Sequence, residues 1–79
     1  MNQNIARGTL RYDSDQDRLY VESEHGTHYF HCGEPLTVCE SNSCKSTRIE
    51  YSHDKEAWYL AGLFRAGEIP QDLQVKYYE

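Results

Sequence analysis

The sequence predicts a small all-β domain, either a curled antiparallel sheet or an SH3-like barrel of five to six short strands. Apolar and polar residues alternate over short segments, which is the period of a half-buried strand. Turn-forming residues separate these segments. The chain has 79 residues, so one sheet that curls on itself fits the length better than a two-layer sandwich. A five-stranded oligonucleotide-binding barrel is the alternative, and that fold usually needs a longer chain.

Residues 1–79 are expected to form one domain, with residues 1–7 as a flexible N-terminal segment. The first strand is predicted at Gly8–Tyr12, and the acidic segment that follows it has turn composition. Arg18–Glu22 and Thr27–Cys32 alternate again and predict two further strands.

A hairpin is predicted in the middle of the chain. Leu36–Cys39 and Cys44–Tyr51 have strand alternation, and the loop Glu40–Ser43 joins them. The preceding residues, Gly33-Glu34-Pro35, should break or bulge the strand, because proline cannot donate to a ladder and glycine often marks a bend.

The structure of the most apolar segment, residues 57–63, is open between two alternatives. Helix propensity and helical spacing of apolar residues favour a helix over residues 54–66. The sequence Trp58-Tyr59-Leu60 favours a strand, and we choose the strand. Pro70–Leu73 is expected to form one helical turn, and residues 73–77 close the chain as a last strand.

Strand alternation assigns the apolar residues to one inward face. Cys32 shares the face of Phe30 and is expected to be buried as a small hydrophobic residue. The predicted core consists of Leu10, Leu19, Val21, Phe30, Leu36, Val38, Ile49, Trp58, Leu60, Leu73 and Val75.

The central hairpin places two cysteines opposite each other. If Leu36 points inward, alternation turns Thr37 and Cys39 outward. A four-residue loop then makes Cys39 and Cys44 the closing pair, with Thr37 opposite Ser46. Directly opposed Cα atoms lie ~4.5–5.5 Å apart, which is within the range of a disulfide. We predict that this pair can be oxidised, although the thiols of a cytoplasmic protein should stay reduced.

The charge of the chain argues against several partners. Asp and Glu number 13 against 8 Lys and Arg, so the formal net charge is -5. Such a field repels phosphate backbones, which makes nucleic acid an unlikely partner. No apolar stretch approaches the ~20 residues that cross a bilayer, and the N-terminus lacks the pattern of a signal peptide. We expect a cytoplasmic protein with no membrane partner.

The sequence contains nominal metal ligands without the spacing of a zinc site. Structural zinc sites use ligand pairs separated by two to four residues on a knuckle. Cys39 and Cys44 have four intervening residues, which permits this geometry, but Cys32 and Cys39 are six residues apart with Pro35 between them. The adjacent His31 and Cys32 would leave a strand on opposite faces. No phosphate-binding loop or catalytic motif is present. We expect no metal, no cofactor and no enzymatic activity. The nominal ligands are Cys32, Cys39, Cys44, His28, His31 and His53.

Three ordered blocks carry a family resemblance: His31-Cys32-Gly33-Glu34, Thr47-Arg48-Ile49-Glu50, and Trp58-Tyr59-Leu60 with Gly62-Leu63. Together they resemble a family of small uncharacterised bacterial proteins, known only as a domain of unknown function, over roughly residues 8–77. Members are found mainly in Gram-positive bacteria and their mobile elements. The resemblance implies one domain and a bacterial or phage setting, and it implies no activity.

The aromatic residues predict an interaction surface. Seven Tyr and one Trp cannot all be buried in so small a core, and alternation turns Tyr20 and Tyr29 away from their apolar neighbours. Exposed aromatic side chains are enriched at protein interfaces. We therefore expect a non-catalytic protein-interaction module. Its candidate binding surface is Tyr20, Tyr29, His31, Arg48 and Glu50.

The finer hypothesis is a phage or mobile-element accessory or inhibitor protein that occupies the surface of a host protein. That surface could be a basic nucleic-acid site, which the carboxylates of this chain would mimic. The alternative is a small nucleic-acid-binding β-barrel. Its local basic patch would consist of Arg7, Arg11, Arg18, Lys45 and Arg48.

Overall fold

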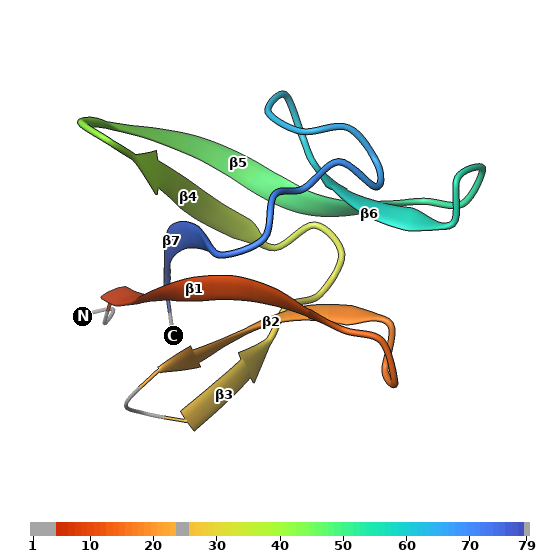
Figure 1. Cartoon of the computed structure of the whole chain (residues 1–79), viewed down its shortest axis with the longest axis horizontal. Coiled ribbons are helices and arrows are strands. Elements are labelled where there is room, and N and C mark those ends of the chain that lie inside the picture. The colour runs from red at the N-terminus through yellow and green to blue at the C-terminus, as the bar shows by residue number, and fades with distance from the viewer. Residues whose placement is uncertain (1–4, 24–25, 79) are drawn as a thin grey trace.

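The computed structural model describes residues 5–23 and 26–78, which form seven antiparallel strands in one curled sheet (Figure 1). The order across the sheet is β3-β2-β1-β7-β4-β5-β6. This confirms the predicted all-β class and curled antiparallel sheet, with seven strands in place of five to six. The strands are β1 (Ile5–Asp13), β2 (Arg18–Ser23), β3 (Gly26–Tyr29), β4 (Pro35–Glu40), β5 (Ser43–Ser52), β6 (Ala57–Leu60) and β7 (Leu73–Tyr78).

The sheet does not close into a barrel. In the part of the chain that the structure describes, β3 and β6 are the two edges, and each pairs with one strand. The segment after β6 covers its outer edge. Leu60 and Phe64 exchange backbone hydrogen bonds of 3.1 and 3.0 Å, and the Gly67 amide donates to the Trp58 carbonyl oxygen at 3.3 Å. The chain therefore adopts the curled sheet and not the closed SH3-like barrel, because the edge strand β6 pairs with the segment that follows it and not with the other edge strand, β3.

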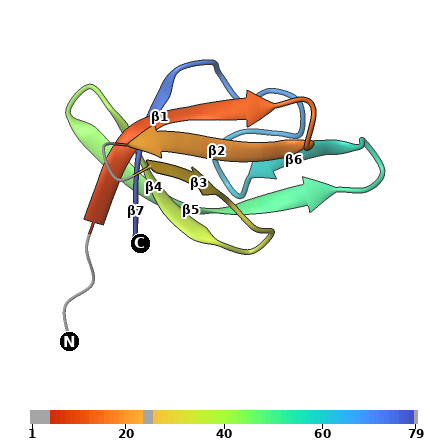
Figure 2. The ribbon, with the colours of Figure 1, turned by 90° about the horizontal axis from the view of Figure 1, so that it is seen from below.

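Two long strands produce the curl by changing partners along their length. β1 pairs with β7 from Ile5 to Leu10 and with β2 from Leu10 to Asp13. β5 pairs with β4 over residues 43–48 and with β6 over residues 49–52. β1–β3 form one side of the molecule and β4–β6 the other, with β7 between them (Figures 1 and 2). One core fills the space that the curl encloses.

The residues of the predicted core are buried, except Trp58. Trp58 is only partly buried, because its indole Nε1 donates to the Asp17 carbonyl oxygen at 3.0 Å at the edge of the core. Ala6 is buried although we expected it in a flexible segment: residues 5–7 belong to β1 and pair with β7, while residues 1–4 lie outside the described residues. The buried apolar residues are Ala6, Leu10, Leu19, Val21, Phe30, Leu36, Val38, Ile49, Leu60, Leu73, Val75 and Tyr77.

The prediction that Cys32 is buried is wrong. β3 ends at Tyr29, and the chain turns at Cys32 and Gly33, where Gly33 has φ 88°. The Gly33 amide donates to the Ile49 carbonyl oxygen at 2.6 Å. The alternation of residues 27–32 therefore stops before Cys32, and its thiol is exposed.

Three other boundaries differ from the prediction. The strand is interrupted at residues 30–34, as expected, but β4 begins at Pro35 and not at Leu36. The first residue of a strand tolerates the missing amide of proline. Residues 57–60 form the strand that we chose, but residues 61–63 form a turn that lets Phe64 fold back on Leu60. Residues 71–72 form a turn with no helical character.

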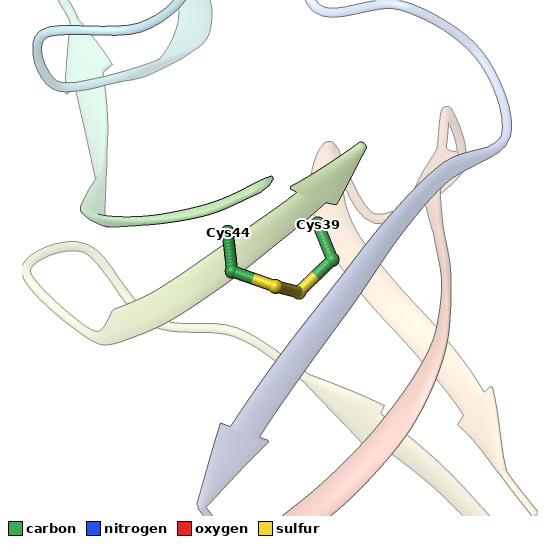
Figure 3. The surroundings of a disulfide bond; sticks show 2 residues. All are labelled: Cys39 and Cys44. Carbon is green, nitrogen blue, oxygen red and sulfur yellow. A yellow bond between two sulfur atoms is a disulfide. The ribbon is translucent and has the colours of Figure 1, made fainter. Parts of the chain in front are cut away.

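The register of the central hairpin is confirmed. Cys39 is opposite Cys44, and Thr37 is opposite Ser46. The two cysteines are joined by a disulfide, with their Cα atoms 4.1 Å apart (Figure 3). The turn is shorter than the predicted four residues, because Glu40 and Ser43 also pair. Two residues remain in the turn, and the first of them has positive φ, as two-residue hairpin turns require.

Reduction of the Cys39–Cys44 bond should lower the free energy of unfolding by about 2 kcal/mol, because the bond restricts a short loop of the unfolded chain. Urea unfolding with and without a reductant measures the difference. The variant Cys39→Ser/Cys44→Ser should unfold identically in both conditions, whereas Cys32→Ser should keep the parent's dependence. If the free energy of unfolding of the parent protein is the same with and without the reductant, the prediction is wrong.

Candidate functional site

The outer face of β1–β3 carries a group of contacting side chains that we call the tyrosine patch: Asp13, Arg18, Tyr20, Tyr29 and His31. Tyr20 and Tyr29 are opposite each other in the β2–β3 ladder, and their ring centroids lie 5.4 Å apart. The Arg18 guanidinium lies 5.7 Å from the centroid of the Tyr29 ring. A cation over an aromatic face is attracted by the ring quadrupole. The two rings are therefore positioned by the pairing of β2 with β3, and the Arg18 guanidinium lies over the Tyr29 ring.

Arg18 connects the patch to the turn after β3. Its Nη2 atom donates to the Phe30 carbonyl oxygen at 3.0 Å and lies 2.8 Å from His31 Nδ1. A guanidinium only donates hydrogen bonds, so His31 accepts through an unprotonated Nδ1. The His31 amide donates to Glu34 Oε1 at 3.0 Å. These contacts fix the His31 ring beside the tyrosines.

Asp13 is the acceptor at the other side of the patch. The Tyr29 hydroxyl donates to Asp13 Oδ2 at 2.8 Å, and the amides of Asp15 and Gln16 donate to Oδ1 at 2.9 and 3.3 Å. The hydrogen bond from Tyr29 is the main cause that lowers the pKa of Asp13, and the backbone amides add to it. The same bond, with burial, raises the pKa of Tyr29. The patch therefore holds an ionised carboxylate next to a neutral phenol.

Replacing Tyr29 by Phe should raise the pKa of Asp13, since the donor that stabilises the carboxylate is removed. Because the folded-state pKa is depressed, this bond stabilises the fold above the ordinary carboxyl pKa and is lost as the pH falls through the folded value. Side-chain carbon NMR over an acid titration measures the shift. Tyr20→Phe is the matched control and should leave the Asp13 titration unchanged. Identical titrations of Asp13 in the parent and in Tyr29→Phe would disprove the assignment.

A second group of polar side chains lies between the β1–β2 and β5–β6 hairpins, whose tips are both at the right of Figure 1. Trp58 of β6 donates its indole proton to the Asp17 carbonyl oxygen at 3.0 Å, which joins the β5–β6 hairpin to the β1–β2 turn. Tyr12 donates to Asp17 Oδ1 at 2.6 Å. Burial raises the pKa of Tyr51, and the nearby charges of Asp17 and Glu56 raise it further. We call the carboxylates of these tips the acidic end: Asp13, Asp15, Asp17, Asp54 and Glu56.

Aromatic rings accompany the acidic end. Tyr51 packs edge-on against Trp58 and His53, with centroid distances of 5.0 and 5.2 Å. The Tyr12 side chain is 54% exposed. Asp13 belongs to both groups, so the acidic end adjoins the tyrosine patch at this residue.

The structure divides the predicted binding residues between two places. Tyr20, Tyr29 and His31 lie together in the tyrosine patch. Arg48 and Glu50 lie on β5: Arg48 is exposed opposite Pro35, and Glu50 accepts a hydrogen bond from the Cys32 thiol at 3.3 Å. Sequence reasoning missed Asp13 and Arg18 as members of the patch. The sequence feature that could have identified them is their position at the two ends of the first turn, since residues at these positions form a cross-strand pair.

The nominal metal ligands do not gather. Among residues 5–23 and 26–78, no group of three or more His, Cys, Asp or Glu side chains could hold a metal ion. His31 Nδ1 faces Arg18 and the Cys32 thiol faces Glu50, so the adjacent pair forms no dyad. His28 Nε2 contacts Glu34 Oε2 at 2.6 Å.

The described residues include no helix that is long and apolar enough to cross a membrane.

Comparison with known proteins identifies a family. The family model described as Domain of unknown function (DUF5348) matches residues 8–77, nearly the whole chain. A search of curated proteins and a search of solved structures each found no match. The family model thus confirms the resemblance to a domain of unknown function that the three sequence blocks predict.

Proposed function

Since the chain belongs to the family described as Domain of unknown function (DUF5348), we propose from its surface that it is a non-catalytic protein-interaction module. The module docks its acidic end and the adjoining tyrosine patch on a basic surface of a partner protein. The observation that carries this proposal is the contact between the two hairpins through Trp58 and Asp17. This contact brings Asp17 and Glu56, from two distant turns, near the half-buried ring of Tyr51.

The geometry suits protein recognition for two physical reasons. Aromatic anchors contribute much of the binding energy of protein interfaces, and Tyr12 and Tyr29 are already held by hydrogen bonds to Asp17 and Asp13. Ordering them on binding therefore loses little conformational entropy. The carboxylates attract a basic partner over a distance and orient it, which raises the association rate.

The finer form of the proposal concerns the partner and the setting. The partner's basic surface is a nucleic-acid-binding site, where the carboxylates of the acidic end take the places of phosphates. The module then acts as an accessory or inhibitory protein of a phage or mobile element. The formal net charge of -5 and the bacterial setting implied by the sequence blocks support this form.

Charge reversal at the acidic end should abolish partner capture. Asp15→Lys/Asp54→Lys changes two exposed tip residues, and Glu40→Lys/Glu68→Lys makes the same change in net charge at exposed residues elsewhere. In pull-downs from bacterial cells, the parent and the control should recover the same protein, and added DNA should displace it. All variants should melt at similar temperatures. The proposal fails if the tip variant retains that protein or if both variants lose it equally.

A further inference from the structure

Four neighbouring strands bring cations and hydroxyls to the outer face at the middle of the sheet. Arg7 is paired with Lys76 in the β1–β7 ladder. The same row continues with Thr37 of β4 and then Ser46 of β5. Directly paired residues lie on one side of a sheet, and Arg48, two residues after Ser46, points the same way. We call these five residues, together with Ile5 and Tyr78, the central stripe.

The next row of the central stripe exposes apolar surface. Ile5 is opposite Tyr78, and their side chains are 58% and 55% exposed. β4 and β7 pair only at Thr37–Lys76 and Val38–Val75, so the two strands diverge beside Tyr78. A hollow of about 180 Å³ lies there. Its lining includes Ile5, Thr37, Ser46, Lys76 and Tyr78.

The cations of the central stripe lack carboxylate partners in the described part of the chain, where the ion pairs are Arg11–Asp72 and His28–Glu34. Like charges directly opposite each other, as in Arg7 and Lys76, destabilise a sheet. An anion bound between them would remove this repulsion.

The acidic end does not cancel the positive potential of the central stripe. Asp13 lies six positions after Arg7 on β1, which is about 20 Å of extended strand. That distance exceeds twice the Debye length of ~8 Å at physiological ionic strength. Two outward carboxylates, Glu22 and Glu50, border the central stripe. Glu22 is opposite Thr27 in the β2–β3 ladder, and Glu50 accepts a hydrogen bond from the Cys32 thiol.

We propose that the central stripe binds single-stranded nucleic acid, at a site separate from the acidic end. Arg7, Lys76 and Arg48 contact phosphates, and an unpaired base stacks on the exposed ring of Tyr78. The hydroxyls of Thr37 and Ser46 donate to phosphate or sugar oxygens. An acidic peptide would satisfy the cations but has no flat base for the ring. Four strands span about 14 Å, which suits a few nucleotides of one strand.

This surface differs from the basic patch that the sequence predicts. Arg18 is engaged in the tyrosine patch, Arg11 pairs with Asp72 at 3.4 Å, and Lys45 is opposite inward-facing Val38. Only Arg7 and Arg48 of the predicted patch belong to the central stripe. Lys76, which pairs with Arg7, joins them in the folded chain.

Fluorescence anisotropy with a labelled oligothymidylate tests the proposal at several salt concentrations. For three phosphate contacts, the logarithm of the association constant should fall with the logarithm of the salt concentration with a slope of about -2. Arg7→Glu/Lys76→Glu should abolish binding. Lys55→Glu/Arg65→Glu, which makes the same change in net charge at exposed residues outside the stripe, should keep most of it. Tyr78→Ala should weaken binding about tenfold or more, whereas Tyr78→Phe keeps the stacking ring and the affinity.

Three results would overturn the proposal. The first is the absence of binding by the parent protein at 50 mM salt, and the second is equal loss in the two charge variants. The third is polyglutamate binding as tight as oligothymidylate binding, which would assign the stripe to acidic peptides. Circular dichroism spectra that match the parent show that each variant is folded. Asp15→Lys/Asp54→Lys should still bind the oligonucleotide, so this test is independent of the proposed protein partner.

Discussion

Truncation of Ile49 to Ala should lower the free energy of unfolding by about 2–5 kcal/mol, through lost burial and the cavity left behind. The Ile49 side chain is 0% exposed. It lies where β5 leaves β4 and begins to pair with β6, and its amide donates to the Glu34 carbonyl oxygen at 2.9 Å. Its backbone is therefore fixed by neighbouring segments, and its side chain is part of the buried core. Small domains have total stabilities of about 5–15 kcal/mol, so this single change removes a large share.

Urea unfolding followed by circular dichroism gives this difference by linear extrapolation. Leu36→Ala, at another inward position, should have a similar effect. Ile49→Val should reduce stability by only about 0.5–1.5 kcal/mol. Ile5→Ala is the matched exposed control and should change stability by less than about 0.5 kcal/mol. If Ile49→Ala unfolds like the parent, the inward face is wrongly assigned.

Replacing Gly8 by Ala should lower the free energy of unfolding by about 1–3 kcal/mol, as overpacking of a well-packed core does. A Cβ atom at Gly8 would overlap Cγ1 of Val21 and lie 3.2 Å from the Glu22 carbonyl oxygen. Val21 is 0% exposed and cannot move outward without disturbing the core. Gly8 pairs with Val75 in β7 just before β1 begins to pair with β2 at Leu10. β1 and β2 approach each other so closely at Gly8 that a side chain does not fit there.

A double-mutant cycle isolates this overlap. Val21→Ala creates its own cavity and should destabilise the protein, but it also makes room for a methyl group at Gly8. The double variant Gly8→Ala/Val21→Ala should therefore be more stable than the sum of the two single effects predicts. Additive effects would show that the methyl group does not meet Val21. Thermal unfolding of the four proteins provides the comparison.

Much of the local structure was predictable because strand alternation repeats every two residues. Leu36 and Val38 indicate the inward face of β4, so the register that places Cys39 opposite Cys44 follows without tertiary information. The Cys32 prediction failed where this local signal ended. A turn residue, Gly33, bonds to Ile49 on a distant strand, and no pattern within residues 27–32 indicates that bond.

The candidate surfaces depend on pairs that are far apart in the sequence. Asp17 receives the indole proton of Trp58, 41 residues away. Arg7 meets Lys76 only because β1 pairs with β7. The predicted group of Tyr20, Tyr29 and His31 did come together, because β2 and β3 are consecutive strands and their contact is nearly local. Arg48 and Glu50 are on β5, on the other side of the curl.

By itself, the sequence determined that this protein is all-β, which strand positions supply most of the core and that Cys39 faces Cys44. Alternation and turn chemistry act over a few residues, so they can be read along the chain. Only the tertiary structure decided which strands are neighbours, that the sheet stays open, and how the charges separate into an acidic end and a central stripe. Strand order depends on which arrangement buries the most apolar surface, and that is a property of the whole chain.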